Sequence, residues 1–403
     1  MHTFNPTLPL ERELGQQIFQ ALQGPVVEAI LKTAKDGSGD EYWRSRMEGH
    51  CMKVDKDILP EFYNLCQEVK ARLNFNEPVD FYVTGDSTLN AFSVAAEDEG
   101  QPHIVNINSA MFDLMSEEEL RFVIGHELGH IINKDSALKR LIYFVFPPDN
   151  TNPPITLQYK IRLHDQLAEL VADRYGFLAN GNLNACVTAF YKMSSGLDLA
   201  KMNVSIDALL ADNRKRLDYF VNGKGLSRHD HPVNPIRVQA INLFSTAKGE
   251  AELEAGMKEL IDILLKVGNG PMDEHLSVFM ATAGLIVANA DEHVSKKEIE
   301  HIIQNLANLQ IFPKRFLDAV AKSDVSNLFD QSVHNILSQN PGMRDGMLAY
   351  VIGLVMSDKE ISLDEIKLLY GFGASLGFSE KEISRKFAEM IQQNYVPSLE
   401  SIC

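Results

Sequence analysis

The residues of this sequence best suited to chemistry are two histidines and a glutamate in a His-Glu-x-x-His pattern, namely His126, Glu127 and His130. Residues four apart lie on one face of a helix, so both imidazoles can point at one metal ion. Zinc prefers nitrogen ligands of this kind, and Glu127 is placed to act as the general base on a metal-bound water. The pattern predicts a hydrolytic zinc site with one Zn²⁺ per chain.

The alternative is a chance match on a surface helix, and the residues around the motif argue against it. An unpaired His-Glu-His group would be costly in or beside a core helix. The flanking positions that indicate such a helix are Leu120, Phe122, Val123, Ile124, Leu128, Ile131 and Ile132.

A catalytic zinc needs a third protein ligand and an open fourth position. The best candidate is Glu169, in the run Glu-Leu-Val-Ala-Asp that ends at Asp173. Asp173 shares its helix face and can accept a hydrogen bond from the free ring nitrogen of a ligand histidine. His164, one turn earlier, is a rival third ligand. The plain alternative for the two acidic residues is a solvated pair on a helix surface.

A third polar segment contains His231 and Arg237, with prolines at positions 232 and 235. His231, on a loop stiffened by proline, could reach the open metal position or hydrogen-bond the oxyanion of amide hydrolysis. Arg237 could pair with Asp173 or hold a substrate carboxylate. A polar turn without a catalytic role is the alternative.

Composition limits the classes of protein that remain. The chain has 403 residues, which suggests two or three domains, and a net charge of −17, which disfavours nucleic acid as a partner. It has no run of 18 apolar residues, and its first residues lack the features of a secretion signal. The four cysteines form no C-x-x-C pair, which is compatible with a reducing compartment. We therefore expect a cytoplasmic protein that is not integral to a membrane.

Periodicity indicates a mainly α (α+β) fold, in which a small sheet and the helix of the metal motif precede an all-α region. Ser116, with a glutamate three residues on, is a capping box that opens the motif helix. The other predicted helices span residues 11–31, 60–73, 157–178 and 250–267, and the predicted strands span 79–83, 91–95 and 103–107. The predicted domain organisation is a lead-in at 1–48, a catalytic domain at 49–249, a helix and linker at 250–271 and an all-α domain at 272–403.

The C-terminal region contains a weak repeat with an offset of 67 residues. Its acidic positions could form a divalent-cation site. The alternative is that each serine caps a helix and each glutamate completes a capping box, which explains the spacing without a metal. The residues concerned are Asp291, Ser295 and Glu298 in the first copy and Asp358, Ser362 and Glu365 in the second.

Taken in order, the motifs of residues 50–245 resemble those of the HtpX-like zinc metallopeptidases, the group that also contains the CAAX prenyl proteases. The matching segments are Pro60-Glu61-Phe62, Asn90-Ala91-Phe92, the Ser116 capping box, the His126–His130 motif, Glu169 with Ala172 and Asp173, and His231-Pro232 with Arg237. Residues 272–395 resemble the TerB-like tellurite-resistance fold, although Glu292 and Lys359 replace its usual glycine.

The first resemblance implies a zincin-like gluzincin in which His126, His130 and Glu169 bind zinc and Glu127 is the base. It implies that Asn90, Ala91 and Phe92 lie on a sheet edge beside the cleft, where an extended peptide adds as a strand. The implied activity is endopeptidase cleavage of extended or unfolded protein segments. The alternative is a catalytically silent or gated peptide-binding or scaffold protein of a stress response.

Many members of that family are integral membrane proteins, with spanning helices between the metal motifs. Here the interval between His130 and Glu169 holds only the apolar residues 141–146 and a proline-rich loop. We therefore expect a soluble relative, in which residues 141–154 form a lid or a self-association patch. The expected partners are a peptide or protein substrate, a second copy of the chain and a protein that docks on the C-terminal domain.

Overall fold

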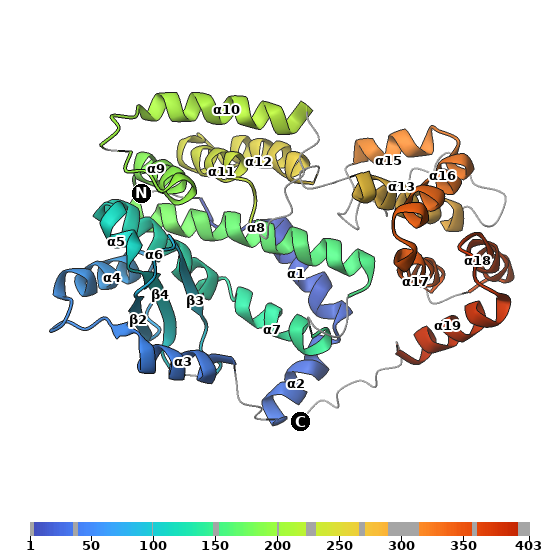
Figure 1. Cartoon of the computed structure of the whole chain (residues 1–403), viewed down its shortest axis with the longest axis horizontal. Coiled ribbons are helices and arrows are strands. Elements are labelled where there is room, and N and C mark those ends of the chain that lie inside the picture. The colour runs from blue at the N-terminus through green and yellow to red at the C-terminus, as the bar shows by residue number, and fades with distance from the viewer. Residues whose placement is uncertain are drawn as a thin grey trace. The chain divides into compact units, whose positions relative to one another are not determined.

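The structure is a computed structural model, and it describes residues 4–34, 39–98, 100–147, 153–199, 201–222, 231–265, 271–288, 314–356 and 361–393 (Figure 1). The chain falls into two compact units. Unit 1 comprises Met1–Pro147, Leu163–Gly223 and His229–Leu264, and unit 2 comprises Pro148–Arg162, Lys224–Arg228 and Leu265–Cys403. The prediction of a mainly α (α+β) fold is confirmed, whereas the domain boundaries at residues 48, 249 and 271 stay predictions.

Unit 1 contains a four-stranded mixed sheet with the order β1-β2-β4-β3. Strand β2 (Val79–Thr84) runs parallel to β4 (His103–Asn108), and β3 (Ala91–Val94) pairs antiparallel with β4. The three predicted strands therefore exist, but the two-residue β1 (Met52–Lys53), antiparallel to β2, was not foreseen. A two-residue strand is too short to show alternation in a sequence. All six residues of β4 are buried, so this strand anchors the sheet in the core.

Helix α6 (Glu117–Ile132) carries the His-Glu-x-x-His motif, and the capping box at its start is present in full. Helix α8 (Ile155–Asn180), coloured green in Figure 1, packs closely against it. A Cβ added to Gly125 would lie 2.4 Å from the Cβ of Ala179, and one added to Gly129 would lie 3.0 Å from the Cα of Ala172. The two glycines of α6 thus permit the close approach that brings the middle of α8 to the metal motif.

The N-terminal region corrects one prediction. The single helix expected at residues 11–31 is two helices, α1 (Pro9–Ala21) and α2 (Gly24–Ala34). Between them Gln23 takes a left-handed conformation with a φ of 54°, which ends the first helix. The apolar spacing continues across this turn, so periodicity alone could not reveal it.

Helix α7 (Asp135–Val145) includes the apolar residues that were proposed as a lid or self-association patch. Leu141 and Ile142 are buried, whereas Tyr143 is 58% exposed and Phe144 is 43% exposed. The segment therefore has one inward and one outward face. Residues 148–152 lie outside the described residues, and the lid remains a hypothesis.

The remaining helices of unit 1 fill out the domain around the sheet and α8. Helix α4 matches its prediction, and α12 ends three residues earlier than predicted. These helices are α3 (Gly39–His50), α4 (Pro60–Arg72), α5 (Ala110–Leu114), α9 (Leu183–Ser195), α10 (Ile206–Asn222), α11 (Asn234–Thr246) and α12 (Glu250–Leu264).

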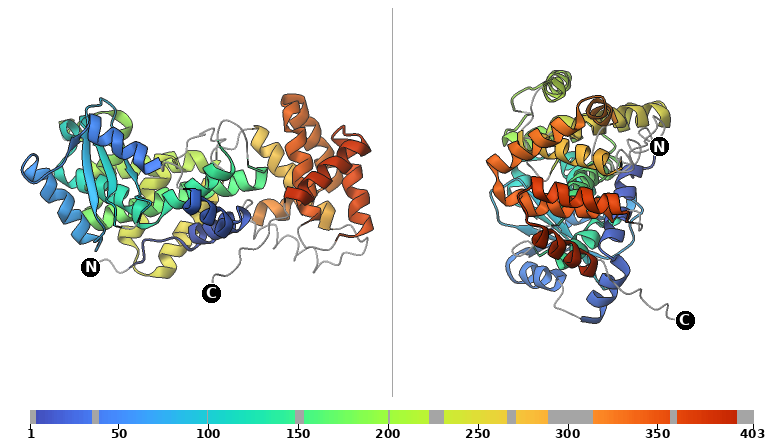
Figure 2. Two further views of the ribbon diagram at one scale, coloured as in Figure 1. Left: turned by 90° about the horizontal axis from the view of Figure 1, so that it is seen from below. Right: turned by 90° about the vertical axis from the view of Figure 1, so that its right-hand side faces the viewer.

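All regular elements in the described residues of unit 2 are helices, and those from residue 271 onward are drawn from gold to red in Figure 2. Its core includes the aromatic residues Phe279, Phe329 and Tyr350, and the ring of Phe279 contacts the other two in tilted geometry. Ser362 and Glu365 form both halves of a capping box, so the capping interpretation is confirmed for the second repeat copy. The first copy and Asp358 lie outside the described residues. The helices are α13 (Pro271–Ala288), α15 (Lys314–Ala321), α16 (Val325–Gln339), α17 (Arg344–Val355), α18 (Leu363–Ser375) and α19 (Glu380–Gln393).

In the part of the chain that the structure describes, none of the helices has the length and apolar character needed to cross a membrane.

Candidate metal centre

His126, His130 and Glu169 bring one potential ligand atom each to a common point. Their ligand atoms all lie within 4.8 Å of one another. The Nε2 atoms of the two histidines are 3.2 Å apart, and Oε1 of Glu169 lies 3.4 Å from Nε2 of His130. The two histidines come from α6 and the glutamate from α8, so the packing of these helices creates the group. Two imidazole nitrogens and one carboxylate form a donor set typical of catalytic zinc.

The other ring nitrogen of each histidine faces an acidic residue. Nδ1 of His126 lies 2.9 Å from Oδ1 of Asp173, and Nδ1 of His130 lies 2.8 Å from Oδ2 of Asp135. Such contacts fix the tautomer of a ligand histidine and leave its Nε2 lone pair for the metal. Asp173 was predicted beside a ligand histidine, and its orienting role stays a prediction. The contact of Asp135 with His130 was not predicted. The available signal was an acidic residue five positions after the second histidine of the motif.

The buried carboxylate of Glu169 provides a test of whether a cation fits the group. The residue is 7% exposed, and its Oε2 has no hydrogen-bond partner among the described residues. A buried carboxylate oxygen without a partner is costly, and a metal ion would satisfy it. The donor set and this oxygen together fit a zinc ion held by His126, His130 and Glu169.

The charges around the group also favour a cation. Burial raises the pKa of Glu169, but the positive charge of Arg237 and the nearby histidines outweigh it, so the pKa is lowered and the carboxylate is ionised. Burial lowers the pKa of His130, but the hydrogen bond to Asp135 and the charges of Glu169 and Glu127 raise it to about 9. Acidic side chains therefore surround the imidazole of His130 and stabilise positive charge there.

Arg237, at the start of α11, forms a buried bidentate pair with Asp173. Its Nε lies 2.8 Å from Oδ2 and its Nη2 lies 2.5 Å from Oδ1. Burial alone would raise the pKa of Asp173, but Arg237 lowers it to about 2. The guanidinium also lies over the ring of Phe190, 4.8 Å from its centroid. Two roles were considered for Arg237, and its geometry favours pairing with Asp173. This pairing orients Asp173, which in turn contacts His126.

His231 and His164 lie at different sites. Nε2 of His231 is 3.4 Å from Oε2 of Glu169, and its side chain is 61% exposed, so it stands at the solvent side of the metal group. Burial lowers the pKa of His231, although the charge of Glu169 opposes this. His164, the rival third ligand, instead lies 3.1 Å from Oε1 of Glu11 and does not belong to the converging group.

Glu127 and the residues proposed to bind substrate lie on two neighbouring elements of unit 1. Glu127 is on α6 between the histidines and is 7% exposed. Ala91 and Phe92 lie in β3, which packs against α6, and Asn90 immediately precedes that strand. In the described part of the chain β3 pairs on one side only, with β4, so it is an edge strand as the resemblance implies.

Comparison with known proteins agrees with this geometry. Residues 61–147 match the model of peptidase family M48. This match includes the whole of α6 and ends before Glu169, so the assignment of the third ligand depends on the geometry described above.

Three curated relatives cover parts of the chain. The chain is 25% identical over 210 residues to the plastoglobule-localized metallopeptidase 48 of Arabidopsis thaliana, which is 49% of this chain and 60% of that protein. It is 34% identical over 83 residues to a protease HtpX homolog of Trichormus variabilis, covering 21% of this chain and 28% of the relative. A Burkholderia cenocepacia HtpX homolog is 29% identical over 92 residues, 23% of this chain and 31% of the relative. The chain thus covers less than two thirds of each relative, and its similarity to peptidase family M48 and to these metallopeptidases and proteases is limited to the matched segments.

Proposed function

We propose that this chain is a zinc-dependent endopeptidase that cleaves extended or unfolded protein segments. His126, His130 and Glu169 would hold one Zn²⁺ per chain. When bound there, zinc supplies Lewis-acid chemistry that activates a water molecule and polarises the scissile carbonyl group. The observation that carries the proposal is the convergence of these three side chains within 4.8 Å, next to Glu127 on the same helix.

In this proposal Glu127 is the general base. It accepts a proton from the attacking water and later passes that proton to the nitrogen of the leaving amine. His231 stands at the open side of the site and donates a hydrogen bond to the oxyanion that develops on the carbonyl oxygen. Asp173 and Asp135 orient the two histidines, and Arg237 holds Asp173 in place through its bidentate contact.

The substrate would bind as an additional strand on the edge of the sheet. Strand β3 has a neighbour on one side among the described residues, so main-chain groups on its other side are available to an extended peptide. Asn90, Ala91 and Phe92 would form this edge. Main-chain pairing accepts many sequences, which suits a peptidase that acts on unfolded segments.

A gated or silent peptide-binding protein is the second candidate. The observation that favours it is the position of His231, whose Nε2 is 3.4 Å from the carboxylate of Glu169. A histidine there could occupy the open position that water needs. In that case the chain would grip extended peptides without cutting them, as a scaffold in a stress response.

One experiment separates the two functions. Zinc is quantified in the purified chain by mass spectrometry, and cleavage of reduced, unfolded casein is followed with and without a chelator. The endopeptidase predicts about one zinc per chain and cleavage that stops with chelator and returns with added zinc. One zinc per chain without cleavage would favour the gated protein, and a chain that binds no zinc would contradict the endopeptidase.

The region after residue 249 is proposed to dock a protein partner. It carries 13 basic and 23 acidic residues, which places most of the net negative charge of the chain there. A basic partner surface would complement it. Its likeness to TerB-like domains, self-association and a cytoplasmic location stay proposals.

A further inference from the structure

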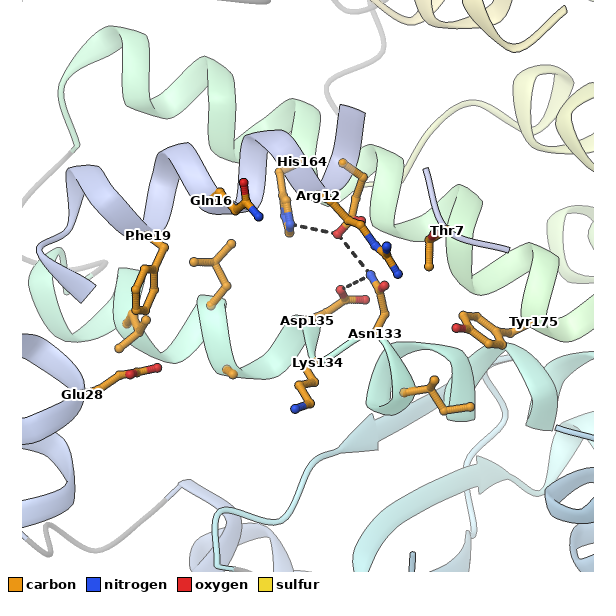
Figure 3. A pocket seen from close by; sticks show the side chains of 16 residues that line it. Thr7, Arg12, Gln16, Phe19, Glu28, Asn133, Lys134, Asp135, His164 and Tyr175 are labelled. Carbon is orange, nitrogen blue, oxygen red and sulfur yellow. Dashed lines mark hydrogen bonds and ion pairs between the residues drawn. The ribbon is translucent and has the colours of Figure 1, made fainter. Parts of the chain in front are cut away.

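Unit 1 contains a cavity of about 640 Å³, and two of its buried residues, Glu11 and His164, have no role in the proposed peptidase chemistry (Figure 3). It is lined by residues of α1, α2, α7 and α8 and by the end of α6. Its rim is polar and exposed, with Arg12, Gln16, Glu28 and Lys134. Its floor is buried and contains three ionisable side chains, Glu11, Asp135 and His164.

Glu11 is the residue whose surroundings indicate that a ligand binds in this cavity. It is 4% exposed, and its Oε1 accepts a hydrogen bond from Nδ2 of Asn133 at 3.1 Å and lies 3.1 Å from Nε2 of His164. Its Oε2 is buried and has no hydrogen-bond partner among the described residues. A carboxylate oxygen left in this state costs free energy that a donor entering the cavity would recover.

The two side chains that contact Oε1 of Glu11, Asn133 and His164, are already engaged and do not satisfy its Oε2. Nδ2 of Asn133 also donates to Oδ1 of Asp135 at 2.7 Å, so both of its hydrogens have acceptors (dashed lines in Figure 3). Nε2 of His164 faces Oε1 of Glu11, and its Nδ1 lies 3.7 Å from Asp165. The missing donor must therefore come from outside this network.

The floor favours a charged donor at Glu11, because its buried Oε2 has no hydrogen-bond partner among the described residues, whereas Asp135 already lies 2.8 Å from His130. A metal ion fits poorly, since the described residues that converge as a ligand group are His126, His130 and Glu169 and none of them lines the cavity. An ammonium group suits the site because it presents three donors from one compact charge. The apolar part of the wall, formed by Phe19, Ile132, Leu138 and Leu141, suits an aliphatic stem.

We propose that this cavity binds a primary ammonium group on an aliphatic stem, and that Oε2 of Glu11 is its acceptor. Two sources share this chemistry, the side chain of a lysine residue and a linear diamine. Glu11 has no part in the proposed zinc binding or catalysis, whereas Asp135, which lines the same cavity, contacts the proposed zinc ligand His130. Occupation of the cavity does not require cleavage.

The test is isothermal titration calorimetry of the full chain with three probes. Nα-acetyl-lysine amide carries the ammonium, 1,5-diaminopentane represents the diamine source, and Nα-acetyl-norleucine amide has the stem without the charge. We expect the lysine amide or the diamine to bind at least about tenfold more tightly than the norleucine amide, because only the amines can donate a charge-assisted hydrogen bond to Glu11. The tighter of the two amines identifies the source.

Matched variants locate the acceptor. Glu11→Gln preserves the shape of the side chain and removes its charge, whereas Glu13→Gln removes an exposed charge from the same helix. Binding of the amines should weaken at least about tenfold in Glu11→Gln and stay unchanged in Glu13→Gln. Equal binding by Glu11→Gln and the wild type, or equal affinity for the lysine and norleucine amides, would overturn the proposal. The comparison of the three probes on the wild type tests the proposal even if Glu11→Gln folds poorly. Titrations in the presence of a chelator separate amine binding from the peptidase function.

Discussion

Nδ1 of His130 lies 2.8 Å from Oδ2 of Asp135, only five residues further along the chain. This close return is possible because Lys134 takes a left-handed conformation with a φ of 61°, which ends α6 and starts α7 in a new direction. Asp135 is the first residue of α7 and is 5% exposed. The same turn that separates two helices therefore aims a carboxylate at a proposed metal ligand.

Replacing Asp135 with asparagine should weaken zinc binding about 10- to 100-fold, because the partner of a ligand histidine tunes its orientation and basicity. The amide retains the size of the side chain, so the fold should persist. Affinity is measured by competition with a chromophoric chelator. The exposed Asp113→Asn variant is the control and should bind zinc as the wild type does. An unchanged affinity in Asp135→Asn would show that this contact does not support the metal.

Replacing Glu127 with glutamine should leave zinc bound and reduce peptide cleavage by about 10²- to 10⁴-fold, the usual contribution of a general base. Glutamine keeps the shape of the residue but cannot accept the proton of water. Zinc content and casein cleavage are measured on the same preparation. Glu118→Gln, an exposed residue in the first turn of α6, serves as control. Equal cleavage rates in the Glu127 variant and the wild type would remove Glu127 from the mechanism.

The short-range features of this site could be predicted from the sequence. The spacing of His126 and His130 places both on one face of any helix, and the capping box at Ser116 indicates where that helix begins. The distance between Glu169 and the histidines depends on how two helices pack. The sequence indicated that Glu169 belongs with them only through the order of motifs shared with the family it resembles. The glycines at 125 and 129 that permit this packing carry no periodic signal of their own.

Features that depend on a single backbone angle or on distant contacts could not be predicted. Gln23 and Lys134 adopt positive φ values that neither residue type signals, and both mark helix boundaries. The pairing of Glu11 with His164 joins residues more than 150 positions apart, so their spacing says nothing about it. For this reason His164 was considered as a metal ligand, whereas it lies in the cavity beside α1.

Replacing Arg237 with methionine should lower the free energy of unfolding by about 3–5 kcal/mol, because it leaves the fully buried charge of Asp173 without a partner. The double variant Arg237→Met with Asp173→Leu should recover much of this loss, since no buried charge remains. Both are measured by urea unfolding of the zinc-free chain. If the double variant is as unstable as the sum of the two single variants, the side chains do not act as a pair.

The pH dependence of stability should show the titration of His164. Burial lowers the pKa of this residue, but the interactions of its ring with the carboxylates of Asp165 and Glu11 raise it from 6.5 to about 9. Because the pKa of His164 is higher in the folded chain than in the unfolded chain, protonation of this residue stabilises the folded state. This contribution is fully present below pH 6.5 and is lost as pH rises through about 9. Other ionisable residues also line this cavity, among them Asp135, Arg12 and Tyr175. They are present in both the wild type and the His164 variant, so the comparison of the two isolates His164.

The measurement compares unfolding free energies of the wild type and His164→Gln from pH 6 to pH 10. Glutamine carries no titrating charge, so the advantage of the wild type should shrink across this range. An advantage that stays constant or grows with pH would show that His164 is neutral in the folded chain.

The capping box of α18 separates the two interpretations of the C-terminal repeat. Oγ of Ser362 accepts a hydrogen bond from the backbone N–H of Glu365 at 3.1 Å, and the Glu365 carboxylate accepts one from the N–H of Ser362 at 2.7 Å. Ser362→Ala should therefore destabilise unit 2 by about 1 kcal/mol, and Glu365→Gln should have little effect because glutamine can also complete a capping box. Thermal unfolding with and without Ca²⁺ or Mg²⁺ measures both. Stabilisation of the wild type by either ion that Glu365→Gln abolishes would instead favour a cation site, because a bound ion stabilises by mass action and needs the carboxylate charge.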